Sequence, residues 1–158
     1  MNQPKVAVAT VIATWFGCGF FPIAPGTVGS AAAVVLAAAI YMWKAYAPLW
    51  LLLPTVLLLF PGIWAAGVVA DARGKKDPGL VVVDEVLGQW ITLMGATVFN
   101  WKSWLLAFFL FRAFDIWKPY PIRNLEALPS GTGIVADDLL AGLYAALVLF
   151  VLGCLNLY

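Results

Sequence analysis

The sequence predicts an all-α integral membrane protein: a helical bundle of about four to five spanning helices, preceded by an N-terminal interfacial or re-entrant helix. Of its 158 residues, 64% are hydrophobic and 11% are charged, whereas soluble domains average about 25% charged residues. The apolar residues also form long runs, which favours insertion into a bilayer. The length fits a single membrane-embedded domain, residues 1–158.

The apolar runs divide into an N-terminal segment and five candidate spans. Residues 6–21 predict a helix that lies on the membrane or enters it partway, because the glycines and prolines between Gly17 and Gly26 interrupt regular structure. Several of the candidate spans are shorter than the ~20 residues that cross a bilayer, so we expect tilted neighbours or a locally thin bilayer. The candidate spans are residues 28–43, 49–70, 81–99, 103–117 and 134–157.

The basic residues predict the orientation of the bundle. If residues 1–27 lie on the cytoplasmic side and every later segment crosses, the opposite side keeps only Lys44 and Lys102. This bias agrees with the positive-inside rule. The net charge of +1 and the absence of a basic run give no indication of nucleic-acid binding. The basic residues placed on the cytoplasmic side are Lys5, Arg73, Lys75, Lys76, Lys118 and Arg123, with Arg112 near that face.

Seven of the eight acidic residues fall in three short stretches, which we expect to meet at the cytoplasmic end of the bundle. A carboxylate within an apolar helix must pair, protonate, bind a cation or line water. Carboxylates that converge repel one another, and a hard divalent cation such as Mg²⁺ or Mn²⁺ would stabilise them. The alternative is that each one pairs with a neighbouring basic residue and only holds the bundle together. The three stretches contain Asp71, Asp77, Asp84 and Glu85; Asp115; and Asp137 and Asp138.

The basic residues near these stretches are candidates for binding a phosphate group. Arg112, Asp115 and Lys118 are spaced i, i+3 and i+6 and share one face if the helix continues. Arg123 follows two prolines and could meet a second phosphate or the lipid surface. Thr27 and Ser30 lie in a glycine-containing segment that enters the first span, where a helix N-terminus attracts anions. Helix capping by these two hydroxyls is an equally good explanation.

The residues that are missing also narrow the chemistry. The chain has no histidine, which excludes phosphohistidine phosphatases and any histidine-based triad or zinc site. Neither of its two cysteines is followed by arginine at the spacing of a cysteine phosphatase loop, and no Asp-x-Asp pair indicates an aspartyl-phosphate enzyme. The phosphatase mechanism that remains is metal-assisted attack by water, with carboxylates as metal ligands and as the general base.

Four stretches together resemble the phosphatidylglycerophosphatase A family of bacterial lipid phosphatases. They are Gly17–Ser30, Asp77–Thr92, Phe111–Arg123 and Gly133–Gly142, and they occur in the family's order over nearly the whole chain. The resemblance implies hydrolysis of phosphatidylglycerophosphate to phosphatidylglycerol with magnesium, in the bacterial inner membrane with the site facing the cytoplasm. By this resemblance, the acidic positions of the family's motifs correspond to Asp77, Asp84, Glu85, Asp115, Asp137 and Asp138, and the basic positions correspond to Arg112 and Lys118.

We therefore expect a magnesium-dependent lipid phosphatase whose partners are a phospholipid substrate and the membrane, with no obligatory protein partner and no nucleic acid. A phosphatase for another phosphomonoester lipid, such as phosphatidate, is an alternative, and a non-enzymatic cation carrier or small channel subunit is a second. The expected metal ligands are Asp77, Asp84, Glu85, Asp137 and Asp138. The expected catalytic residues are Asp84, Asp115 and Asp138, of which Asp115 completes the metal shell or acts as general base. The expected substrate-binding residues are Thr27, Ser30, Arg112, Lys118 and Arg123.

Overall fold

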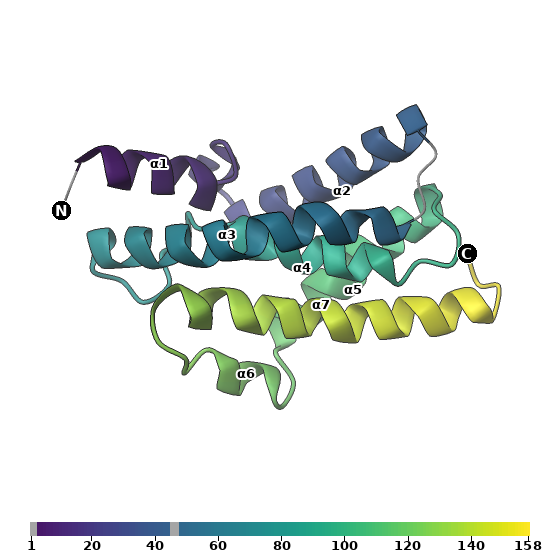
Figure 1. The fold of residues 1–158 in the computed structure, drawn as a ribbon. Coiled ribbons are helices and arrows are strands. Elements are labelled where there is room, and N and C mark those ends of the chain that lie inside the picture. The colour runs from purple at the N-terminus through teal and green to yellow at the C-terminus, as the bar shows by residue number, and fades with distance from the viewer. Residues whose placement is uncertain (1–2, 45–47) are drawn as a thin grey trace.

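The computed structural model describes residues 3–44 and 48–158, and this part of the chain is helical, without strands. Two short 3₁₀ helices, Cys18–Phe20 and Pro48–Leu51, precede α2 and α3. The α-helices lie side by side along one direction, with the N-terminus and the C-terminus at opposite ends (Figure 1). They are α1 (Gln3–Ala13), α2 (Pro25–Lys44), α3 (Leu52–Arg73), α4 (Val83–Met94), α5 (Trp101–Trp117), α6 (Ile122–Leu125) and α7 (Ser130–Cys154).

Three segments are long and apolar enough to cross a membrane: Pro25–Trp43, Pro48–Arg73 and Ser130–Cys154. The other two expected spans, residues 81–99 and 103–117, correspond to helices below this length; the first is shorter in the structure than expected, whereas the second is slightly longer and ends where expected. Helix α5 has 17 residues, about 26 Å of helix, and α4 has 12, about 18 Å. Both fall below the roughly 30 Å of a hydrocarbon core. The all-α membrane bundle is therefore confirmed, with three helices of full spanning length among those described.

Helix α4 is short because it is the centre of the bundle. It packs against α2, α3, α5 and α7, and nine of its twelve residues are buried. Gly95 ends the helix against α7, since a Cβ at this position would overlap the backbone of Ala146. Because the surrounding helices cover α4, its first turn presents Asp84 and Glu85 to the protein interior.

The N-terminal segment covers the start of α4. Helix α1 lies along α3, and the chain then folds back through the 3₁₀ helix Cys18–Phe20. The backbone N–H of Val82 donates to the Ala13 carbonyl at 2.8 Å. Gly19 lies directly against the Leu80 carbonyl, so any side chain there would overlap it. The segment before α2 thus fixes the loop that leads into α4.

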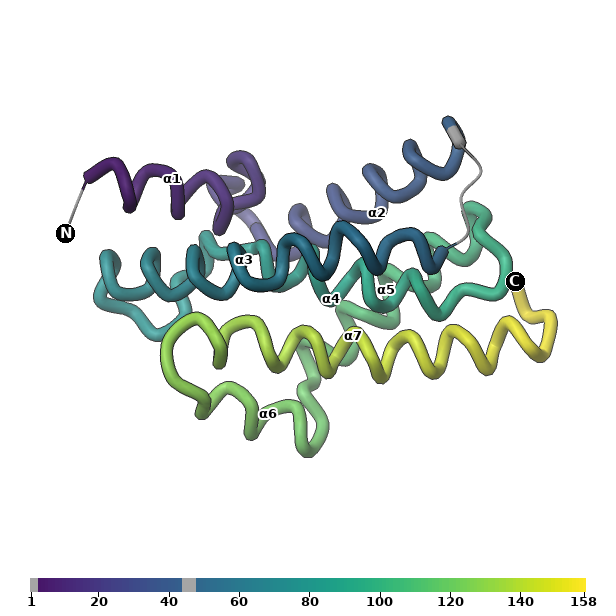
Figure 2. The backbone as a smooth tube through the Cα atoms, viewed as in Figure 1, coloured from purple at the N-terminus to yellow at the C-terminus, as the bar shows by residue number. Residues whose placement is uncertain are grey.

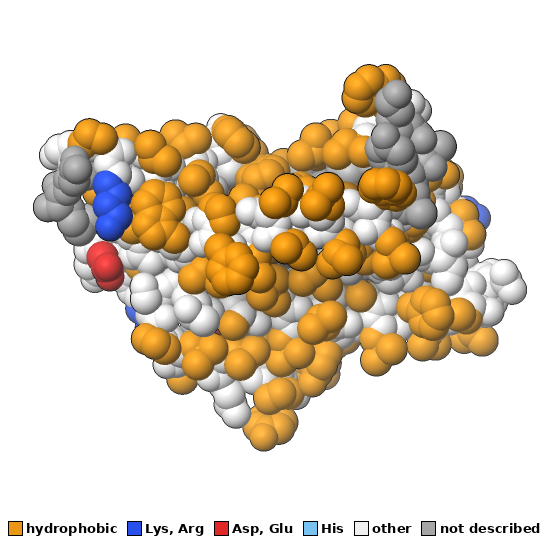
Figure 3. All heavy atoms as spheres, viewed as in Figure 1, with side chains coloured by type: hydrophobic (Ala, Val, Ile, Leu, Met, Phe, Trp, Pro, Cys, Tyr) orange, Lys and Arg blue, Asp and Glu red, His pale blue; other side chains and the backbone are white. Residues whose placement is uncertain are grey.

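The outer surface matches a protein that sits in lipid. Apolar side chains cover the length of the face shown in Figure 3, and most of the charged side chains visible there lie at the end where α1 begins and α3 ends. The tube view shows that this is also the end at which α7 begins, with α6 beside its first half (Figure 2). On this face, charge is therefore concentrated towards one end of an otherwise apolar surface.

Candidate active site

Six carboxylates line one small cavity at the charged end of the bundle. They come from the loop before α4, the first turn of α4, the end of α5 and the second and third turns of α7. The cavity has a volume of about 80 Å³, enough for several water-sized groups. One cation, Lys118, is among its described lining residues. The six acidic residues are Asp77, Asp84, Glu85, Asp115, Asp137 and Asp138.

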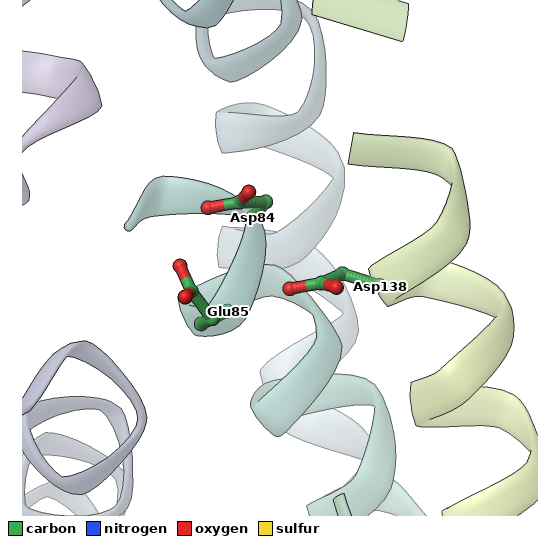
Figure 4. A group of neighbouring side chains, drawn as sticks. All are labelled: Asp84, Glu85 and Asp138. Carbon is green, nitrogen blue, oxygen red and sulfur yellow. The ribbon is translucent and has the colours of Figure 1, made fainter. Parts of the chain in front are cut away.

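Three of these carboxylates lie close enough together that they could hold a metal ion. Each of Asp84, Glu85 and Asp138 offers one oxygen, and these three atoms all lie within 4.8 Å of one another. Asp138 points from α7 towards the other two on α4 (Figure 4). Asp84 Oδ1, Glu85 Oε2 and Asp138 Oδ2 are buried and accept no hydrogen bond from the described residues. Buried anionic oxygens without donors are expensive, so this all-oxygen set fits a hard divalent cation.

A glycine contact brings the two halves of this group together. A Cβ on Gly142 of α7 would overlap the backbone of Gly88 of α4. Gly88 follows Asp84 by four residues, and Gly142 follows Asp138 by four residues. Residues i and i+4 lie on the same face of a helix, one turn apart. The close approach of the helices at the two glycines therefore sets the separation of Asp84 and Asp138 one turn away.

Arg112 is held between two carboxylates. Its Nη1 atom lies 2.6 Å from Asp115 Oδ2 and 3.7 Å from Glu85 Oε1. Asp115 is 8% exposed, so the pair is largely removed from water. Such a pair fixes the orientation of both side chains, and Arg112 links the end of α5 to the first turn of α4.

Lys118 does not continue the helical face of Arg112 and Asp115. Helix α5 ends at Trp117, and Lys118 adopts a left-handed backbone with φ 46°. The i, i+6 alignment required the helix to continue, and it does not, because a residue before a proline disfavours the helical region and Pro119 follows. The Lys118 side chain nevertheless reaches the cavity, where Nζ donates to Asp137 Oδ2 at 2.6 Å and to Glu126 Oε1 at 2.7 Å.

These bonds keep Lys118 charged. Burial alone lowers the pKa of Lys118, but the hydrogen bonds to Asp137 and Glu126 outweigh it and raise the pKa above its usual value. The same hydrogen bond from Lys118 lowers the pKa of Glu126. Glu126 was not expected at the site, since it stands apart from the three acidic stretches in the sequence. The one feature of the sequence that could have indicated a role for Glu126 is that charged residues are rare in this chain.

The remaining candidates lie further from the carboxylates. The Ser30 hydroxyl is fully buried and donates to the Gly26 carbonyl at 2.9 Å, within its own helix. Thr27 is half-buried in the first turn of α2. Arg123 is exposed on α6 and is not among the described residues that line the carboxylate cavity. Gly26, which the sequence marked only as an interruption of regular structure, adjoins the site: a Cβ there would overlap the Glu85 carboxylate.

The fold and the cavity together define a class of protein: a membrane-embedded helical bundle with a polyacidic cavity suited to phosphoryl chemistry. Comparison with known families makes the class specific, since residues 11–153 match the family described as Phosphatidylglycerophosphatase A. The chain belongs to this family of phosphoric monoester hydrolases. The resemblance of the four motifs and the expected enzyme class are thereby confirmed.

Similar proteins cover nearly the same length. A protein of Escherichia coli named phosphatidylglycerophosphatase A is 36% identical over 90% of this chain and 82% of its own. One of the same name from Haemophilus influenzae is 38% identical over 89% and 85%. A Bacteroides thetaiotaomicron protein, provisionally named phosphatidylinositol-3-phosphatase, is 41% identical over 96% of both chains. No solved structure matches the chain.

Proposed function

We propose that this protein hydrolyses the terminal phosphomonoester of phosphatidylglycerophosphate, releasing phosphatidylglycerol and inorganic phosphate, with Mg²⁺ as cofactor. The observation that carries the proposal is the group of buried, donor-free carboxylate oxygens on Asp84, Glu85 and Asp138, with Lys118 in the same cavity. The family membership supports the reaction class, and the names of two relatives support the substrate.

The cavity supplies groups for each part of the reaction. Water attacks phosphorus, the bond from phosphorus to the glycerol oxygen breaks, and the leaving oxygen takes up a proton. We assign acceptance of the proton from water to Asp115, because Arg112 fixes this carboxylate at the cavity wall. Lys118, whose raised pKa keeps it charged, and Arg112 offset the negative charge of the phosphoryl oxygens.

Asp84, Glu85 and Asp138 are the residues that we propose hold Mg²⁺. Asp137 contributes through its second oxygen, since Oδ2 already accepts from Lys118 while the buried Oδ1 has no hydrogen-bond donor among the described residues. Asp77 lies at the exposed rim of the cavity. When bound, the cation supplies Lewis-acid polarisation of the phosphoryl group and neutralises the carboxylate cluster.

We also propose that the bundle lies in the bacterial inner membrane with the cavity facing the cytoplasm. The three long apolar helices support membrane insertion. The basic residues of the loop before α4 and of the segment after α5 support the orientation, since both adjoin the carboxylate cavity.

The decisive experiment measures phosphate release from phosphatidylglycerophosphate by the purified protein in detergent micelles. EDTA is expected to abolish release, and added Mg²⁺ to restore it, because the clustered carboxylates need a divalent cation to act on a phosphate dianion. A rate that is unchanged by EDTA, after passage of the protein over a chelating resin, would contradict the metal-carboxylate mechanism. Absence of release at saturating Mg²⁺ would contradict the substrate.

A second substrate has a specific observation in its favour. The Bacteroides relative is 41% identical over 96% of both chains and carries the name of a phosphatidylinositol-3-phosphatase. Both lipids present a phosphomonoester on a polyol headgroup, so the carboxylate cavity can serve either. Comparing kcat/KM for phosphatidylglycerophosphate, phosphatidylinositol 3-phosphate and phosphatidate decides among them, and our proposal requires the first to be the highest.

The replacement Gly26→Ala is expected to lower kcat about 10- to 100-fold with little change in Tm. The new Cβ would meet the end of the flexible Glu85 side chain, which can move aside and so limits the loss of stability. Moving this carboxylate by about 1 Å away from Asp84 and Asp138 disturbs a site that depends on its geometry. Phosphate release and thermal unfolding are the measurements, and an unchanged kcat would show that the position of Glu85 is not critical.

A further inference from the structure

A second cavity adjoins the carboxylate cavity and is larger, with a volume of about 130 Å³ against about 80 Å³. Asp77, Ile134 and Asp137 line both cavities, so the two share a wall. The second one opens towards the loop before α4 and the turn after α6. Its remaining described lining residues are Lys76, Glu126 and Gly133.

The lining of this second cavity combines one cation with several hydrogen-bond acceptors. Lys76 is exposed at its rim. Asp77, Glu126 and Asp137 supply carboxylate oxygens. Asp137 is 3% exposed, and because its Oδ1 is assigned above to Mg²⁺, Asp77 and Glu126 are the acceptors that remain for a ligand in this cavity. Carboxylate oxygens accept hydrogen bonds from hydroxyl groups. A group that carries hydroxyls and a nearby negative charge therefore matches this lining.

Backbone packing holds the second cavity in shape. Gly133, in the first turn of α7, lies directly beneath the Leu128 carbonyl, and a Cβ there would overlap it and press on the Glu126 carbonyl. The turn after α6 is thus seated on α7 by close backbone contact. Lys118 adds a side-chain link, since Nζ lies 2.7 Å from Glu126 Oε1. Glu126 is consequently held at the wall of the second cavity.

The covalent order of the proposed substrate fits the order of the two cavities. In phosphatidylglycerophosphate the phosphomonoester is followed by a glycerol unit with a free hydroxyl, and then by the phosphodiester that leads to the acyl chains. Resting on the proposed function, we propose that the second cavity is the subsite for the polyol unit of the headgroup, with Lys76 binding the phosphodiester. The one free hydroxyl of the polyol donates a hydrogen bond to Asp77 or to Glu126.

This subsite separates two classes of phosphomonoester lipid. Phosphatidate carries its phosphate directly on the diacylglycerol, so it has neither a headgroup polyol nor a phosphodiester to place against Lys76. The second cavity therefore favours phosphodiester-linked polyol phosphates, and the carboxylate cavity alone does not distinguish them from phosphatidate.

The test compares Lys76→Gln with Lys75→Gln in neutral detergent micelles. Lys75 is the matched control, since it is exposed beside Lys76 in the sequence and shares with it the neighbouring hollow, but is not among the described residues that line the second cavity. Lys76→Gln is expected to reduce kcat/KM for phosphatidylglycerophosphate about tenfold, the usual effect of removing a charge-assisted hydrogen bond. It should leave kcat/KM for phosphatidate within about twofold, and Lys75→Gln should change neither.

A binding measurement supports the kinetic one. Glycerophosphoglycerol, the deacylated polyol phosphodiester, is expected to inhibit the wild-type protein and the Lys75→Gln variant competitively, and Lys76→Gln about tenfold less well. Equal losses on both lipids, or inhibition that does not depend on Lys76, would overturn the subsite. Absence of hydrolysis of phosphatidylglycerophosphate by the wild-type protein would instead overturn the proposed function.

Discussion

Replacing Asp138 by asparagine is expected to reduce phosphate release by a factor of at least ~100 while leaving the Tm of the metal-free protein unchanged or higher. Asp138 is 3% exposed and shares its surroundings with Asp84 and Glu85. An amide has nearly the same shape as a carboxylate but carries no charge. The substitution therefore relieves repulsion among buried anions and replaces one of the three anionic groups that we propose hold Mg²⁺ by a neutral amide, which binds the cation more weakly.

Two measurements separate this outcome from simple damage to the fold. Addition of Mg²⁺ is expected to raise the Tm of the wild-type protein, because a ligand that binds only the folded state stabilises it. Asp138→Asn should lose this increase. Asp71→Asn is the matched control, since Asp71 is exposed on α3 and lies outside the carboxylate cavity. An active Asp138→Asn variant, or one that still gains stability from Mg²⁺, would contradict the assignment.

The substitution Gly142→Ala is expected to lower the free energy of unfolding by about 1–3 kcal/mol, the usual range for overpacking, and to abolish most activity. The three atoms nearest to a Cβ at this position all belong to the backbone of Gly88. Backbone cannot rotate away as a side chain can, so α4 and α7 must separate. Asp84 and Asp138 lie one turn from this contact and would separate with them.

The neighbouring glycine on α3 provides the comparison. Gly62 also faces α4, but a Cβ there would meet side-chain atoms of Val83 and Leu87 at 3.3 and 3.4 Å. Gly62→Ala should therefore change the Tm much less and leave kcat within about twofold, since side chains at this distance can adjust by a few tenths of an ångström. Thermal unfolding in detergent and phosphate release measure both effects. Equal behaviour of the two variants would show that the Gly88–Gly142 contact does not set the geometry of the site.

The all-α bundle and the meeting of its acidic stretches could be predicted from the sequence because both follow from one physical constraint. A chain with so few charges places them where they can pair, bind a cation or reach water. Asp84, Asp115 and Asp138 stand far apart in the sequence, yet they line one cavity in the structure. The roles of the individual carboxylates were not predictable in this way, because metal ligands and ion-paired carboxylates have the same residue types.

Helix ends and tertiary partners were harder to predict. Residues 95–99 are mostly apolar, so the expected span continued through them, whereas packing of Gly95 against α7 ends α4 at Met94. The end of α5 was an exception, because Pro119 provided a local signal and the expected span ended at Trp117, as α5 does. No local signal in the sequence predicted that Glu126 pairs with Lys118. The turn after α6 brings Glu126 to Lys118 through backbone packing on Gly133.

The position of Asp138 along α7 has a consequence for how the enzyme meets its substrate. Ser130 opens this helix and Asp138 follows eight residues later, about 12 Å along the axis. If Ser130–Cys154 crosses the bilayer, this depth places the carboxylate group inside the end of the span, within the membrane instead of in the surrounding water. The lipid substrate then reaches the cavity by lateral diffusion in the membrane, and the attacking water has to enter the cavity from outside the bilayer. For such an enzyme the effective substrate concentration is two-dimensional: the rate follows the mole fraction of substrate lipid in the membrane, and dilution by other lipids slows it at constant bulk concentration.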